Sequence, residues 1–108
     1  MAFYRYVSVD EHTVVVAVTP NRVPNTDRFG RPKLVYFSHD LYTTVGDAET
    51  ALMIGTLNPT GATAPPAYRL DIDLTGMAWT HHGTAAGGTG SEYTTPDSPL
   101  VTAATGIS

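Results

Sequence analysis

Residues 68–74 carry the pattern that most restricts the fold of this chain. Large apolar residues alternate there with charged ones, in the order Tyr-Arg-Leu-Asp-Ile-Asp-Leu. Successive side chains of a strand point to opposite faces, so the pattern predicts a strand with one buried face and one face in water. The chain is therefore built around a sheet that packs on a core.

Turn-forming residues limit the length of the remaining elements. Ten Gly and eight Pro among 108 residues predict frequent turns and short elements rather than a helical bundle. Hydrophobic residues make up 42% of the chain and charged residues 15%, which supports a packed core and argues against disorder. The length fits one domain, residues 1–108, of mixed α and β structure with more strand than helix.

Several functional classes are disfavoured by composition. The absence of Cys excludes disulfides, a thiolate nucleophile and any zinc site built on cysteine. A net charge of −4 is not the basic footprint of a nucleic-acid binder, although Arg22, Arg28, Arg31 and Lys33 leave room for a local anion site. Because we find neither a signal-peptide core nor an apolar membrane span, we expect a cytoplasmic protein by default and no membrane partner. A secreted effector domain would share these features.

Local patterns predict four further strands and several loops. β-branched and aromatic residues favour strands at residues 3–7, 34–38, 92–95 and 100–107, and we expect the last two to form a hairpin. Loops are expected at residues 20–32, 56–67 and 77–90. The last of these contains Trp79, the pair His81–His82 and a glycine-rich segment at 87–90 that we expect to act as a flexible hinge.

Two helices are expected, one with conflicting signals. Ser8 and Glu11 have the spacing of a capping box, whereas residues 12–18 have strong β propensity; we expect a short helix that ends before Pro20. A second helix begins after Asp40 or Thr44, and Gly55 suits its C-terminal cap.

Three short motifs stand out in their order along the chain. They are Phe3-Tyr4-Arg5 in the first strand, Tyr36-Phe37-Ser38 in the second, and Gly90-Ser91-Glu92-Tyr93 entering a late strand. Together they resemble the Arg–Ser–Glu triad of the ADP-ribosyltransferases, in the cholera-toxin-like branch. The resemblance implies an α+β fold with two small, mostly antiparallel sheets around a cleft and one or two helices.

The resemblance also implies a role for each residue. Arg5 would grip the pyrophosphate of NAD⁺, because its planar charged fork can bond phosphate in two places. Glu92 would stabilise the oxocarbenium-like state formed as the bond to nicotinamide breaks. Ser38 would hold Glu92 or the nicotinamide ribose by hydrogen bond, and Tyr36 or Tyr93 would stack on the nicotinamide.

The chain departs from the family pattern at two places. Gly90 stands where many of these toxins have Gln or Glu, so no preference for an acceptor amino acid carries over. Ser38-His39-Asp40 replaces the familiar Ser-Thr-Ser. The acceptor is left open as a protein, a nucleic acid, a small molecule or water. Such a domain is often a toxin or effector neutralised by a partner protein.

Other interpretations stay open for the same residues. Taken singly, Arg5 suits a strand arginine paired with a carboxylate, Ser38 a serine that caps the next helix, and Glu92 an exposed strand carboxylate. His81 and His82 with His39, Asp71 or Asp73 suggest a metal, but adjacent His residues seldom share one, so we expect no metal site. The alternatives to the enzyme are a non-catalytic β-rich binding or structural module and an inactive nucleotide-binding relative.

Overall fold

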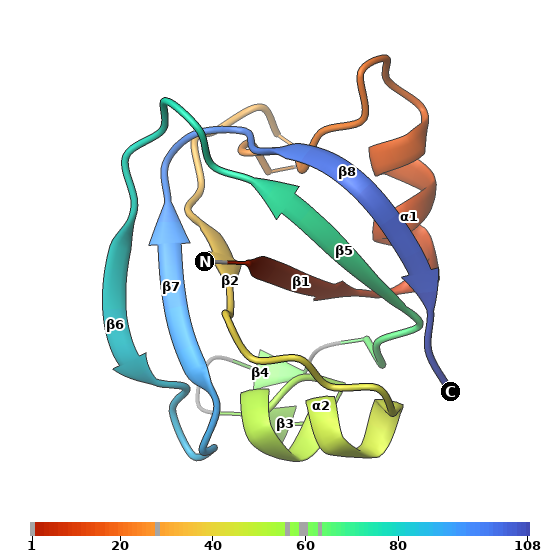
Figure 1. Ribbon diagram of the computed structural model, residues 1–108, viewed down its shortest axis with the longest axis vertical. Helices are drawn as coiled ribbons and strands as arrows, with labels where there is room; N and C mark the ends of the chain where they lie inside the picture. Colours follow the sequence, from red (N-terminus) through yellow and green to blue (C-terminus); the bar gives the residue numbers. More distant parts are fainter. Residues whose placement is uncertain (1, 28, 56, 59–60, 63) are drawn as a thin grey trace.

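The computed structural model of the chain describes residues 2–27, 29–55, 57–58, 61–62 and 64–108. The described residues form an α+β fold (Figure 1). The elements in chain order are β1 (Phe3–Val7), α1 (Val9–Val16), β2 (Val35–Phe37), α2 (Val45–Leu52), β3 (Leu57–Asn58), β4 (Gly61–Ala62), β5 (Tyr68–Asp73), β6 (Thr80–Thr84), β7 (Ser91–Thr95) and β8 (Leu100–Gly106). Among the described residues, no helix is long and apolar enough to cross a membrane.

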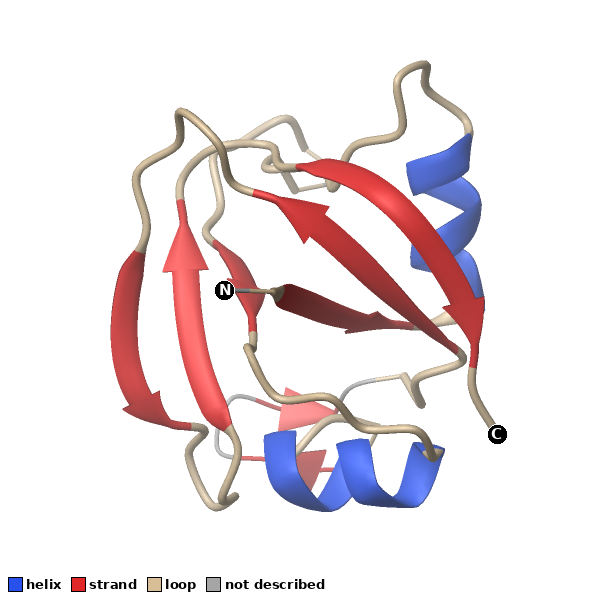
Figure 2. Ribbon diagram, viewed as in Figure 1, coloured by secondary structure: helices blue, strands red, loops and turns tan. Residues whose placement is uncertain are grey.

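Two antiparallel three-stranded sheets make up the body of the fold (Figure 2). One has the order β1-β5-β8, and the other has the order β2-β7-β6. The short strands β3 and β4 pair with each other. The predicted fold class, two small antiparallel sheets with two helices, is confirmed. The strand predicted from strict alternation is β5, with Leu70 and Ile72 buried on its core face.

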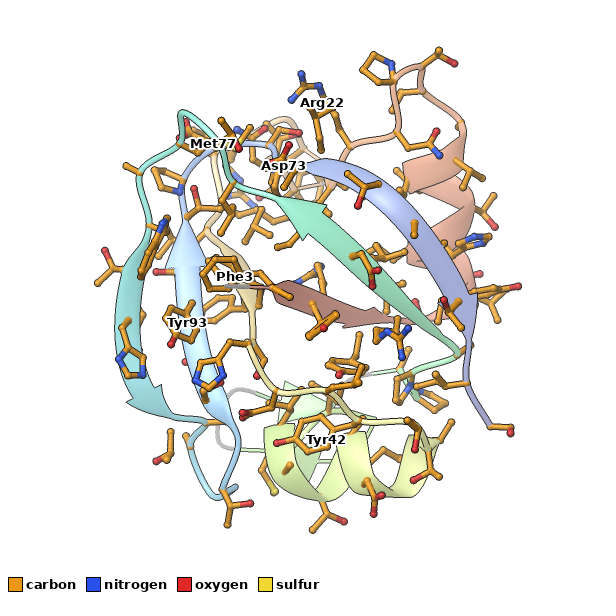
Figure 3. All side chains as sticks on the ribbon, in the orientation of Figure 1. Phe3, Arg22, Tyr42, Asp73, Met77 and Tyr93 are labelled. Atoms are coloured by element: carbon orange, nitrogen blue, oxygen red, sulfur yellow. The ribbon has the colours of Figure 1, made fainter. Side chains whose placement is uncertain are left out.

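The two sheets are joined where β1 meets the residue after β2. The N–H of Tyr4 donates to the carbonyl of Ser38 at 2.7 Å, and the N–H of Ser38 donates back to Tyr4 at 2.8 Å. Beside this junction the rings of Phe3, Phe37 and Tyr93 pack in the core, with centroids 5.2 to 5.5 Å apart. Phe3 and Tyr93 are seen side by side in Figure 3. The aromatic core therefore fixes β1 against β7 and β2.

Both helices begin at a side-chain cap. The hydroxyl of Ser8 accepts the N–H of Glu11 at 3.2 Å, and that of Thr44 accepts the N–H of Asp47 at 3.2 Å. The cap at Ser8 was predicted, and the helix forms in spite of the β propensity of its valines because the cap satisfies an unpaired N–H group. The carboxylate of Glu11 does not complete the capping box, since it pairs with Arg5. Helix α2 ends earlier than predicted, with Met53 rather than Gly55 as its left-handed cap.

Three sequence-based predictions about the late elements are wrong. The strands β7 and β8 do not form a hairpin, because β7 pairs with β2 and β6 whereas β8 pairs with β5 in the other sheet. His81 and His82 belong to strand β6 rather than to a loop. The predicted loop at 56–67 contains β3 and β4; residues 56, 59, 60 and 63, like Arg28, lie outside the described residues.

Candidate active site

A cavity of about 490 Å³ lies between the C-terminal end of α2 and the strands around the sheet junction. Its apolar wall comes from residues that follow or end α2 and from the loop after β6: Leu52, Met53, Ile54, Ala85 and Ala86. The strands and the residues beside them contribute the rest of the lining, which includes the polar residues Arg5, Tyr36, Ser38, Ser91 and Glu92. The three predicted triad residues and Tyr36, from separate parts of the sequence, therefore line one space.

The carboxylate of Glu11 and the carbonyl of Tyr36 hold the guanidinium of Arg5. Its Nε and Nη2 atoms donate to the two carboxylate oxygens of Glu11 at 2.6 and 2.7 Å, and Nη1 donates to the carbonyl of Tyr36 at 2.6 Å. An arginine has five N–H donors, so two remain for a ligand. The Arg5 and Glu11 side chains are only 19% and 22% exposed, and Glu11 balances the charge of Arg5.

The hydroxyl of Ser38 contacts the neighbour of Glu92 rather than Glu92 itself. Ser38 is 1% exposed, and its Oγ lies 2.9 Å from the Oγ of Ser91. It also accepts the N–H of Asp40 at 3.1 Å. Because β2 ends at Phe37 and Ser38 turns to pair with β1, the expected hydrogen bond from Ser38 to Glu92 is not formed. Ser38 therefore acts on Glu92 only through Ser91.

Glu92 lines the cavity from strand β7. It is partly buried and lies opposite Gly83, beside an irregularity in the pairing of β6 with β7. Within the described part of the chain, its side chain makes no hydrogen bond or ion pair. Since Arg5 is already balanced by Glu11, the negative charge of Glu92 is not compensated among the cavity residues that the structure describes.

The two predicted stacking tyrosines differ in position. Tyr36 is 50% exposed and lines the cavity next to Arg5. Tyr93 is 4% exposed and is enclosed by Phe37, Trp79 and the stacked ring of His81, at a centroid distance of 4.5 Å. Tyr93 is not among the residues that line the cavity, whereas Tyr36 is. Tyr93 is a core residue, and only Tyr36 is placed to stack on a ligand.

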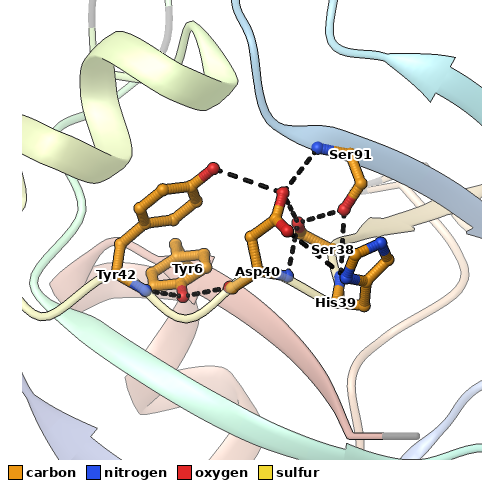
Figure 4. A network of polar contacts seen from close by, with 6 residues as sticks. All are labelled: Tyr6, Ser38, His39, Asp40, Tyr42 and Ser91. Atoms are coloured by element: carbon orange, nitrogen blue, oxygen red, sulfur yellow. Dashed lines mark hydrogen bonds and ion pairs between the residues drawn. The ribbon is translucent and has the colours of Figure 1, made fainter.

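Asp40 is the centre of a polar network that the sequence patterns did not reveal (Figure 4). Its Oδ2 accepts the N–H of Ser91 at 2.7 Å and the hydroxyl of Tyr42 at 3.3 Å. The hydroxyl of Tyr6 donates to the carbonyl of Asp40 and accepts the N–H of Tyr42, both at 2.7 Å. Partial burial opposes the charge of Asp40, but hydrogen bonds from Ser91 outweigh it and hold the carboxyl pKa below its usual value. No local signal could have found the pair, since Asp40 and Ser91 are 51 residues apart.

The glycine-rich segment before Glu92 is docked on α2 rather than free. The N–H groups of Thr89 and Gly90 donate to the carbonyl of Ala51 at 3.0 and 2.8 Å, which satisfies one of the unpaired carbonyls at the helix end. A Cβ atom at Gly88 would lie 2.1 Å from that carbonyl oxygen, and one at Gly90 would lie 2.6 Å from Leu52. Glycine is therefore needed here for close approach, and the predicted hinge is a packed contact.

Both histidines of β6 contact residues of the neighbouring strand β7. The ring of His81 stacks on Tyr93, and Nε2 of His82 lies 2.7 Å from the hydroxyl of Thr94. Among the described residues, no three His, Asp or Glu side chains gather in an arrangement that could hold a metal ion.

No family model matches the chain, and no characterised protein or solved structure shows significant similarity to it. The case for a function therefore depends on the cavity and on the residues that line it.

Proposed function

We propose that the chain cleaves NAD⁺ at its nicotinamide–ribose bond, either by transferring ADP-ribose to an acceptor or by hydrolysis. One observation carries the proposal. Arg5, Tyr36, Ser38 and Glu92, which come from three separate segments of the chain, line the same cavity. A purely structural module gives no reason for these four residues to gather at one concave site.

The size of the cavity suits one end of a dinucleotide. Small-molecule sites span roughly 300 to 1,000 Å³ and combine apolar walls with a few polar groups. A cavity of about 490 Å³ lined by both apolar and polar residues has this character. We assign it to the nicotinamide ribose and the adjacent phosphates, with the adenosine end outside.

Charge favours a bound nicotinamide beside Glu92. The nicotinamide ring of NAD⁺ is cationic, and the carboxylate of Glu92, which has no ion pair among the described residues, attracts it. As the glycosidic bond breaks, its electron pair leaves with nicotinamide and positive charge develops on the ribose. Glu92 stabilises that charge, in the way that carboxylates serve glycoside hydrolysis. The oxygen of water or of an acceptor hydroxyl then bonds to the ribose carbon, and its proton passes to the solvent.

Arg5 and Tyr36 supply the binding contacts. The two remaining N–H donors of Arg5 bond the pyrophosphate, and Glu11 with the Tyr36 carbonyl keeps the guanidinium in place. The half-exposed ring of Tyr36 stacks on the nicotinamide. The acceptor is a protein, a nucleic acid, a small molecule or water.

Nicotinamide release from NAD⁺ by the purified protein tests the proposal. Wild type is compared with Glu92→Gln and with Asp10→Asn, a control that removes one negative charge from an exposed position on α1. We expect release by wild type and the control, and a loss of roughly a hundredfold or more in Glu92→Gln. Absence of both release and NAD⁺ binding would leave the non-catalytic module, and binding without release would indicate an inactive relative.

A further inference from the structure

We propose that Asp40 is a positioning residue that fixes the first residues of β7, and with them the direction in which Glu92 enters the cavity. The inference rests on the proposed function, since it assigns Asp40 to the same site. Asp40 does not line the cavity and acts through Ser91.

The strongest contact is between the Asp40 carboxylate and the main chain of Ser91. The N–H of Ser91 donates to Oδ2 of Asp40 at 2.7 Å, a short hydrogen bond to a charged acceptor. Such bonds are about twice as strong as those between neutral groups. Ser91 is covalently joined to Glu92, so a shift of its main chain moves the next side chain.

The same short segment holds Ser91 from a second side. The Oγ of Ser38 lies 2.9 Å from the Oγ of Ser91, and the N–H of His39 donates to that hydroxyl at 3.3 Å. The hydroxyl of Tyr42 and the Oγ of Ser38 also reach Oδ2 of Asp40, at 3.3 and 3.5 Å. Ser38, His39 and Asp40 thus hold the first residue of β7 by hydrogen bonds (Figure 4).

The residue before Ser91 is fixed as well. The N–H of Gly90 bonds the carbonyl of Ala51 at the end of α2, so the chain enters β7 at a defined place. From there the N–H of Ser91 is satisfied by Asp40 rather than by a neighbouring strand. Asp40 thus supplies a charged acceptor to the start of β7, and its Oδ1 also lies 3.3 Å from Nδ1 of His39.

A carboxylate suits this position best, because several donors converge on one of its oxygens. An asparagine at this position keeps one acceptor oxygen for the Ser91 N–H but loses the charge, and alanine loses both. The proposal therefore predicts an order of effects, with Asp40→Ala greater than Asp40→Asn. A residue that merely filled space would not produce this order.

The test combines kinetics with amide hydrogen exchange on the full chain. In Asp40→Ala we expect kcat for nicotinamide release to fall roughly tenfold to a hundredfold with KM within about twofold, because Glu92 is misplaced while the binding residues stay. Asp40→Asn should recover much of kcat. The Ser91 amide should exchange roughly ten times faster or more in Asp40→Ala, with core amides such as Leu70 unchanged. Wild-type kcat or wild-type exchange at Ser91 in Asp40→Ala would overturn the proposal.

Two controls keep the outcomes separate. Asp10→Asn should match wild type in both measurements, and Ser91→Ala should keep a protected amide at residue 91 because it retains the N–H group. If Asp40→Ala fails to fold, Asp40→Asn tests the proposal instead. The proposal then requires that Asp40→Asn has faster exchange at the Ser91 amide and a lower kcat than wild type. If wild type releases no nicotinamide, the proposed function fails, and the exchange data alone decide whether Asp40 fixes Ser91.

Discussion

The carboxylate of Glu11 binds the guanidinium of Arg5 through two hydrogen bonds of 2.6 and 2.7 Å, from the first turn of α1 to the middle of β1. The pair ties the helix to the strand and balances the one arginine that lines the cavity. Glu11 therefore contributes to stability, while it lowers the positive charge that a phosphate meets.

The substitution Glu11→Gln should therefore lower the stability of the fold and raise its affinity for a phosphate ligand. We expect the free energy of unfolding to fall by about 1–2 kcal/mol, because a charge-assisted pair becomes a neutral one. The affinity for ADP-ribose should rise roughly threefold to tenfold, because Arg5 loses its counter-charge. Urea unfolding and calorimetric titration measure the two quantities. Asp10→Asn is the matched control, since it removes a charge from the same helix turn without touching Arg5. Weaker binding in Glu11→Gln would show that Glu11 serves mainly to orient Arg5.

Gly88 provides a test of the contact between α2 and the loop before β7. In Gly88→Ala the new Cβ would lie 2.1 Å from the Ala51 carbonyl oxygen, so the loop must move away from the helix. We expect a loss of about 1–3 kcal/mol in stability together with lower nicotinamide release. Gly46→Ala is the control, because no atom lies within 4 Å of its added Cβ and alanine favours α2 by up to about 1 kcal/mol. Equal stability of Gly88→Ala and wild type would contradict the docked loop.

Tyr6 makes stability depend on pH in the alkaline range. Burial of its ring raises the pKa of Tyr6 from 10.0 to about 12. The unfolded chain loses this proton near pH 10 while the folded chain keeps it, so the stability from Tyr6 is complete below pH 10 and is lost as pH rises towards 12. Tyr6→Phe loses the hydrogen bonds to Asp40 and Tyr42, which should cost about 1–2 kcal/mol at neutral pH. In urea unfolding, the gap between the two proteins should narrow from pH 10 to 12, and a constant gap would be inconsistent with the buried phenol.

The two tyrosines that were predicted to stack on nicotinamide should respond differently to substitution by alanine. Tyr36→Ala should change stability by less than about 1 kcal/mol and weaken NAD⁺ binding roughly fivefold, since the ring is half exposed and faces the cavity. Tyr93→Ala should lose about 3–5 kcal/mol, because its ring is enclosed in the core. Thermal unfolding and calorimetry measure these effects. A stability loss in Tyr36→Ala as large as that in Tyr93→Ala would refute the assignment.

Local patterns predicted the features that depend on nearby residues. Strict alternation located β5, and Ser8 marked the start of α1 because a cap acts within three residues. For α2 the sequence left Asp40 and Thr44 as candidate caps, and Thr44 is the cap. The resemblance of the three motifs to an ADP-ribosyltransferase triad implied that Arg5, Ser38 and Glu92 share a cleft, and the three residues line one cavity.

Features that depend on contacts between residues far apart in the sequence were not predicted. The turn between β7 and β8 gives no sign that the chain crosses to the other sheet, so a hairpin was expected. Strand β6 is exposed throughout and has no apolar alternation to reveal it. The contact of Asp40 with Ser91 and the docking of Gly88 on Ala51 depend on three-dimensional proximity that neither residue type indicates.

The most direct test of the account is to find where NAD⁺ binds. Amide chemical shifts of Glu92→Gln, which keeps the cavity but not the carboxylate, are recorded during titration with NAD⁺. We predict that the shifts gather at Arg5, Tyr36, Ser38 and Ser91, around the cavity that these residues line. Shifts confined to another surface, such as the groove beside Arg22 and Val18, or no shifts at all, would contradict the claim that this cavity is an NAD⁺ site.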